Sequence, residues 1–205
     1  MNHAAALSAH AESPHHDQHA LGGWTPLKVG MASFLFSEAA LFATLIVAYL
    51  KFLGQDDGGP TPEVLNVGRE LVAVILLLVS SITVQFASRD LARGRCTSCT
   101  VGVILTFILT VGFLIVTGLE WRELIAVDGL TINRNLFGSS FYTLFGFHLG
   151  HVLAGCVMLL IMMGIAFSGS LNARSSPGME AIAWYWHFVN GVSVTLFLVV
   201  YVITR

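Results

Sequence analysis

The chain has 205 residues, of which 55% are hydrophobic and 11% are charged, and its formal net charge is −2. An average soluble domain carries about a quarter charged residues, so the composition excludes a soluble globular domain and an intrinsically disordered chain. The small net charge gives no electrostatic reason to expect a nucleic-acid partner. The composition therefore predicts an integral membrane protein.

The first segment, residues 1–28, differs from the rest because it is rich in histidine: His3, His10, His15, His16 and His19. It lacks a positively charged stretch followed directly by an apolar one, so it does not resemble a signal peptide. Clustered histidines can bind metal loosely. We interpret this segment as a mobile hydrophilic tail.

Five apolar segments follow, and each is long enough to cross a bilayer, which takes roughly 20 predominantly apolar residues in a helix. They lack the alternating pattern of membrane β-strands. The connections between them are short, and no internal repeat is visible. The sequence predicts an all-α polytopic membrane protein, a bundle of five transmembrane helices over about residues 29–52, 67–87, 100–119, 141–167 and 181–203.

Few ionisable residues lie inside these segments, and such residues are costly in a bilayer and functional by default. Glu38 lies nine residues into the first segment, which is about 14 Å along a helix and close to the membrane centre. His148 and His151 stand three residues apart in the fourth segment and share a helix face. His187 lies in the fifth. We predict that these four side chains form a polar cluster inside the bundle.

Three kinds of function suit such a cluster. A metal or haem site is disfavoured because no Glu stands three residues before a His in any segment, and Glu38 is the only acid in the predicted bilayer core. An independent proton-linked carrier would show broken helices or several acids. A structural and lipid-contact role, with Glu38 bonded to a histidine, fits best, and we expect no catalytic residue and no metal in this chain.

Other polar side chains are expected to hold helices together. Ser80, Ser81 and Thr83 form a polar stretch in the second segment.

The positively charged residues divide equally between the two sides of the membrane, but three of them cluster in 89–95 and most acids lie on the opposite side. This distribution favours a cytoplasmic N-terminus.

Five short motifs occur in order along the predicted helices. The first three are Phe34–Phe42 (FLFSEAALF), Ser80–Thr83 (SSIT) and Glu120–Glu123 (EWRE). The last two are Gly138–Val152 (GSSFYTLFGFHLGHV) and Trp184–Val189 (WYWHFV). Together they resemble the motifs of subunit III of the haem–copper terminal oxidases (the cytochrome c oxidase subunit 3 family), in its five-helix bacterial form.

The resemblance implies a subunit without a redox centre that packs beside subunit I, which holds the haems and copper of a complex that reduces dioxygen and pumps protons. Subunit II, a small subunit IV and bound phospholipid are the other partners that it implies. In the family, the carboxylate matching Glu38 reacts with carbodiimides, and the subunit supports proton uptake and prevents turnover-linked inactivation. It also implies a bacterial inner-membrane location, with the N-terminus in the cytoplasm and the C-terminus outside.

The last motif departs from the family pattern W-H-F-V-D-x-V-W at two positions, because Asn190 replaces the acid and Ser193 replaces the second tryptophan. An amide cannot carry a proton, so we interpret Asn190, like Glu120 and Glu123, as a structural polar residue. The departures leave open a nitric oxide reductase-associated relative, and the histidine-rich tail resembles some ubiquinol oxidase third subunits. Glu rather than Asp at position 38 favours the cytochrome c branch.

Overall fold

The computed structural model describes residues 25–55 and 58–204, and over these ranges the chain is helical and contains no strand. Five helices in the described ranges are long and apolar enough to cross a membrane, which confirms the predicted fold class. The interpretation of residues 1–28 as a mobile tail falls mainly on residues 1–24, which lie outside the described residues.

Each predicted segment corresponds to one helix, and the first four helices are longer than the apolar cores that predicted them: α1 (Pro26–Phe52), α2 (Val67–Ala92), α3 (Cys96–Ala126), α4 (Leu136–Phe167) and α5 (Ser176–Leu196). Helix α5 continues into a π-helical segment, Phe197–Ile203, and short 3₁₀ turns lie at Pro62–Val64 and Ala173–Ser175. The extra turns carry polar and charged residues, which a count of apolar residues leaves out.

Side-chain caps explain where three helices begin. Helix α1 starts three residues before the predicted span because Thr25 accepts a hydrogen bond from the backbone N–H of Lys28 and Pro26 occupies the first turn. Asn66 caps α2 in the same way, and Asn135 caps α4. The Asn135 amide also donates to the carbonyl of Pro60, which ties the α1–α2 and α3–α4 connections together.

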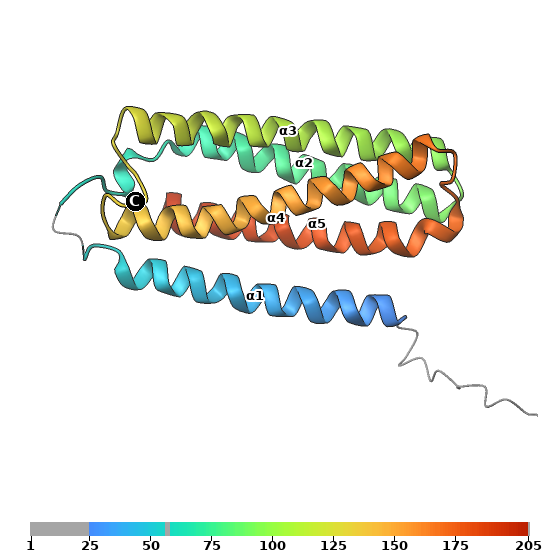
Figure 1. The fold of residues 1–205 in the computed structure, drawn as a ribbon, viewed down its shortest axis with the longest axis horizontal. Coiled ribbons are helices and arrows are strands. Elements are labelled where there is room, and N and C mark those ends of the chain that lie inside the picture. Colours follow the sequence, from blue (N-terminus) through green and yellow to red (C-terminus); the bar gives the residue numbers. More distant parts are fainter. Residues whose placement is uncertain (1–24, 56–57, 205) are drawn as a thin grey trace, which may run out of the picture.

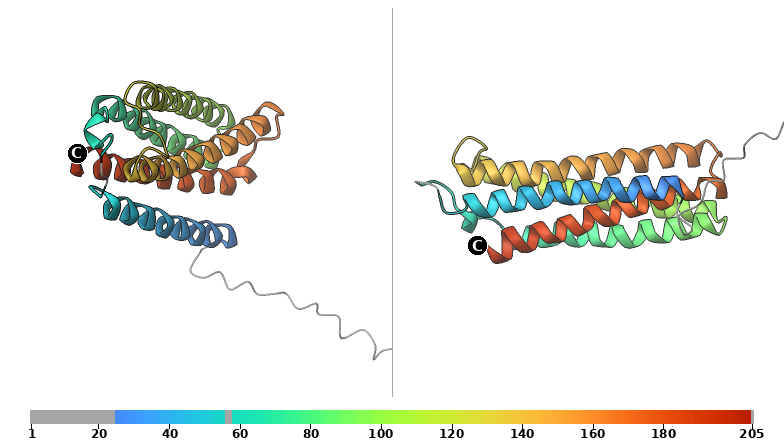
Figure 2. Two further views of the ribbon diagram at one scale, coloured as in Figure 1. Left: turned by 60° about the vertical axis from the view of Figure 1, so that its left-hand side comes forward. Right: turned by 90° about the horizontal axis from the view of Figure 1, so that it is seen from below.

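The helices form layers, with α1 on one side of α4 and α5 and with α2 and α3 on the other (Figure 1). Seen from the α1 side, α1 lies over the boundary between α4 and α5 (Figure 2, right). It packs against these two helices, whereas α2 packs most closely on α3 and also on α5. Only Phe42 and Tyr49 of α1 are buried, so α1 is the most loosely attached helix.

Trp186 of α5 is the largest fully buried side chain among the described residues and joins three helices. Its indole N–H donates to the Ser80 hydroxyl on α2 over 2.8 Å. Its ring lies directly on the backbone of Gly155 in α4, where a Cβ atom would overlap the ring. Glycine at this position therefore allows α4 and α5 to approach each other closely.

The Gly155–Trp186 contact predicts the effect of a substitution in the core. Gly155→Val should displace the ring and break its bond to Ser80, lowering stability by roughly 1–3 kcal/mol, the usual cost of overpacking. The measurement is the fraction of purified protein that stays monodisperse after heating in mild detergent. Gly164→Ala is the matched control, since open space surrounds that position on the same helix. Equal stability of the two variants would contradict the packing role.

Candidate functional site

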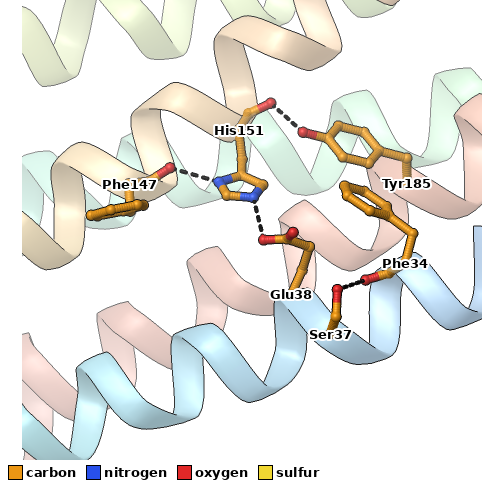
Figure 3. Close-up of polar contacts among 6 residues, drawn as sticks. All are labelled: Phe34, Ser37, Glu38, Phe147, His151 and Tyr185. Atoms are coloured by element: carbon orange, nitrogen blue, oxygen red, sulfur yellow. Dashed lines mark hydrogen bonds and ion pairs between the residues drawn. The ribbon is translucent and has the colours of Figure 1, made fainter.

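An intramembrane acid and a histidine join α1 to α4 (Figure 3). Glu38 Oε2 lies 2.9 Å from His151 Nε2, and the other ring nitrogen, Nδ1, lies 2.7 Å from the backbone carbonyl oxygen of Phe147. Both side chains are mostly covered, with 18% of Glu38 and 15% of His151 exposed. The sequence analysis predicted a bond between Glu38 and a histidine, and the partner is His151.

The chemistry of these two contacts fixes how many protons the pair holds. The Phe147 carbonyl only accepts, so His151 Nδ1 must carry a hydrogen. The remaining contact then needs one proton between Nε2 and the carboxyl group. That proton is either on His151, giving an imidazolium–carboxylate pair, or on Glu38, giving two neutral groups. The pair therefore holds one exchangeable proton and has zero net charge in both forms.

Aromatic side chains fix the position of this pair. The Tyr185 hydroxyl donates to the His151 backbone carbonyl over 2.8 Å, and its ring stacks on Phe34 of α1 at a centroid distance of 6.4 Å. The edge of Phe42 meets the His151 ring at 5.1 Å. Sequence reasoning did not identify Tyr185 and Phe34 as parts of the site, although both lie in the motifs that it singled out.

A groove of about 540 Å³ opens beside the pair, between α1 and α4, and His151 and Tyr185 form part of its wall. Its floor is a row of small residues on α4, Gly146, Gly150 and Ala154. A Cβ atom at either glycine would meet open space, so these residues keep the groove free of side chains. The rest of the lining is mainly aromatic and apolar, which suits a hydrocarbon chain.

His148 lies next to His151 but points toward the centre of the bundle. It is buried, and its ring meets the edges of Phe42 on α1 and Phe113 on α3 at 6.4 and 6.2 Å. Neither ring nitrogen has a hydrogen-bond partner among the described residues. Phe42 thus contacts both histidines, and His148 belongs to the site through ring packing rather than through a hydrogen bond.

His187 belongs to a different polar group from the other three predicted residues. Its Nδ1 lies 2.5 Å from the Ser81 hydroxyl, and its Nε2 lies 2.8 Å from Oε1 of Gln85. The side chain is exposed on the outside of the bundle, where α5 meets α2. The predicted set therefore divides into the Glu38–His151 pair with His148 beside it, and a separate group around His187.

The predicted structural polar residues bridge helices or bond within them. Ser80 accepts from Trp186, and the Thr83 hydroxyl lies 2.7 Å from the Thr106 hydroxyl on α3. Asn190 donates to the backbone carbonyl of Trp186 over 2.8 Å, and its own side-chain oxygen is buried without a partner among the described residues.

A second buried acidic site lies at the end of the bundle near the C-terminus. Glu120 is buried and accepts a hydrogen bond from the Tyr201 hydroxyl, 3.1 Å away, whereas Glu123 is half exposed and pairs with Arg69. Glu70 is also buried, within electrostatic range of Glu120. The sequence analysis identified Glu38 as the only acid in the bilayer core and missed the burial of Glu70, whose place in the first turn of α2 gives no signal of it.

No group of three His, Cys, Asp or Glu side chains within residues 25–55 and 58–204 is arranged to hold a metal ion. The Glu38–His151 pair and the groove offer hydrogen bonding, transfer of a single proton and contact with an apolar ligand.

Comparison with known proteins shows that the chain is similar to subunit 3 of respiratory oxidases. The family described as cytochrome c oxidase subunit III matches residues 7–205. The cytochrome bo(3) ubiquinol oxidase subunit 3 of Pseudomonas aeruginosa is 32% identical over 204 residues, which cover 96% of each chain. Cytochrome c oxidase subunit 3 of Bacillus subtilis is 32% identical over 174 residues, 84% of each chain. That of Corynebacterium diphtheriae is also 32% identical, over 86% of this chain and 88% of the relative.

The geometry of the Glu38–His151 pair predicts different effects for two substitutions. Glu38→Leu leaves His151 Nε2 unpaired and should lower stability by about 0.6–2 kcal/mol, the range for hydrogen bonds between membrane helices. Glu38→Gln should change it little, because the amide can donate to Nε2. Thermal unfolding in detergent measures both, with Ser37→Ala as the control because that hydroxyl bonds only to its own helix. Equal losses for Leu and Gln would show that the bond does not hold α1.

Proposed function

The chain belongs to the cytochrome c oxidase subunit III family, and on this basis we propose that it is the non-catalytic subunit III of a bacterial haem–copper oxidase. In this proposal it packs beside subunit I, which holds the haems and copper, and stabilises it while dioxygen is reduced. In this proposal the redox centres all belong to the partner subunit and none to this chain. Subunit II and a small subunit IV are the other proposed partners.

The observation that carries the proposed role is the 2.9 Å contact between Glu38 Oε2 and His151 Nε2, which requires one shared proton. A carboxyl group and an imidazole 2.9 Å apart can pass that proton between them without a change in net charge. Such a transfer avoids the cost of placing an unpaired charge in the membrane. We propose that the pair relays protons on the route to subunit I, binding one proton as it gives up another, so that its net charge stays zero. Tyr185 acts as a positioning residue because it holds the His151 backbone.

The groove beside the pair supports a second part of the proposal, which is phospholipid binding. Its lining is mainly apolar and aromatic, and most of it comes from α4. An acyl chain lying over Gly146 and Gly150 would shield the Glu38–His151 proton from other acceptors. The polar cluster would then serve both proton uptake and lipid contact, with His148 supporting it from the core side through Phe42.

The proposed location is the bacterial cytoplasmic membrane, with the N-terminus inside and the C-terminus outside. The connection between α2 and α3 lies at the same end of the bundle as the start of α1 (Figure 1). Arg89, Arg93 and Arg95 lie in or beside this connection. Positive charge close to the ends of spans favours the cytoplasmic side.

A ubiquinol oxidase subunit III is the second candidate function. The relative with that name matches over 96% of both chains, at the same 32% identity as the cytochrome c oxidase relatives from Bacillus subtilis and Corynebacterium diphtheriae. Glu38 is the feature that made us favour the cytochrome c branch. Family membership favours either oxidase over the independent proton-linked carrier that the isolated residues left open, and nothing further supports a nitric oxide reductase-associated relative.

The proton role of Glu38 predicts a loss of function that is separate from stability. In the purified complex, Glu38→Gln should keep the bond to His151 and remove the exchangeable proton. We expect slower proton uptake and a several-fold shorter active lifetime during turnover, with subunit III still bound. Ser37→Ala is the control. Proton uptake and lifetime equal to those of the native complex would leave Glu38 with a packing role only.

The electron donor can be identified with the same complex. If the cytochrome c assignment holds, the complex that co-purifies with this chain oxidises reduced cytochrome c and not ubiquinol. Oxidation of ubiquinol alone would establish the second candidate. Purification of the chain without any haem-containing subunit would contradict both.

A further inference from the structure

Two buried carboxyl groups, Glu70 and Glu120, lie at the end of the bundle that holds the C-terminus. Glu70 stands in the first turn of α2 and Glu120 near the end of α3, and these two antiparallel helices pack closely on each other with those ends together (Figure 1). Only 4% of Glu70 and 2% of Glu120 is exposed. Glu120 lies within electrostatic range of Glu70, and both lie within range of the Tyr201 hydroxyl. The two acids therefore share one buried site.

The surroundings give this carboxyl pair no cation of its own in the described part of the chain. Arg69 on α2 lies within electrostatic range, but its guanidinium pairs with Glu123 at the end of the bundle. Tyr49 on α1 and Tyr201 in the π-helical segment contribute hydroxyl groups, and α4 contributes the Phe145 ring, which meets the Tyr201 ring at 6.0 Å. Like charges that share a buried site repel so strongly that one of them takes up a proton.

The hydrogen bonds of Glu120 show where that proton is needed. Oε1 of Glu120 accepts from the Tyr201 hydroxyl over 3.1 Å, whereas Oε2 is buried without a partner among the described residues. The Thr117 hydroxyl, one turn earlier on the same face of α3, is also buried and has no partner there. Buried polar atoms are nearly always hydrogen-bonded. A protonated Glu70 supplies a donor for Oε2 and removes the second negative charge in the same step.

We propose that Glu70 and Glu120 form a second proton-binding site of this chain, in which Glu70 carries the proton and donates it to Oε2 of Glu120. The ligand is a single proton, and Tyr201 holds the other oxygen of the ionised partner. Glu123 lies one turn beyond Glu120, and half of its side chain is exposed. The proton therefore exchanges with the aqueous phase at the C-terminal end of the bundle.

This site is separate from the Glu38–His151 pair and does not rest on the relay proposed there. Glu38 stands eleven positions before Tyr49 on α1, which corresponds to about 16 Å along the helix. Tyr49 is the α1 residue within electrostatic range of Tyr201. The tests below leave the relay aside, so either proposal can fail without the other.

The first test is infrared spectroscopy of the full chain in phospholipid vesicles at neutral pH, read at the carbonyl stretch of protonated carboxyl groups. Every sample carries Glu38→Gln, so that the other intramembrane acid does not contribute. We expect a band that moves when glutamate carries ¹³C in its side-chain carboxyl group and that is lost in Glu70→Gln. Glu123→Gln is the matched control and should keep the band, because Glu123 lies at the same end but is half exposed and paired with Arg69.

Two results of this experiment would overturn the site. One is the absence of an isotope-sensitive band in the chain that retains Glu70, which would mean that both carboxyl groups are ionised. The other is a band that survives Glu70→Gln unchanged. The isotope measurement needs no change at Glu70, so it decides the question even if the Glu70→Gln chain fails to fold.

The second test is thermal unfolding in mild detergent at neutral pH. Glu70→Leu removes the donor to Oε2 of Glu120, whereas Glu70→Gln offers an amide N–H in its place. We expect the Leu variant to melt several degrees below the native chain and the Gln variant to melt close to it. Two ionised carboxylates would instead repel each other, and loss of one would raise the melting temperature. A Leu variant that melts at or above the native temperature, or equal losses in the two variants, would contradict the shared proton.

Discussion

The hydrogen-bonded pair of Glu38 and His151 holds α1 against the rest of the bundle. In a bilayer, apolar side chains gain little by leaving lipid for protein, so a helix with few buried residues is held by its polar contacts and close packing. Helix α1 has two buried side chains, Phe42 and Tyr49. The same side chains that position the proton therefore also position the helix, and structure and chemistry at this site are not separable without a substitution that keeps the bond.

The same constraint explains the other contacts between helices. Trp186 reaches Ser80, Thr83 reaches Thr106, and Tyr201 reaches Glu120, each across a helix boundary and each inside the apolar part of the chain or close to its edge. Small residues allow neighbouring helices to lie close together, as Gly155 does beneath the Trp186 ring. Polar pairing sets which helices are neighbours, and small residues set how near they come.

The number and order of the helices were predictable because apolar length alone decides whether a segment spans a bilayer. Glu38 and His151 were predictable because charged and imidazole groups are rare there. The separation of His187 from them was not, since depth along a helix does not tell which way a side chain faces in the bundle. Glu70 was missed because a residue in the first turn of a span has the same sequence pattern whether it faces water or the core.

The contacts of α1 impose an order on assembly. Glu38 is 113 residues before its partner His151, and the Tyr49 hydroxyl meets Thr204, 155 residues later. Helix α1 is synthesised before the other four described helices, yet its main contacts are with α4 and α5, which are synthesised last. Until α4 has been made, the Glu38 carboxyl group lacks its His151 partner. The Glu38–His151 bond therefore closes the bundle late, only after the last helices have been made.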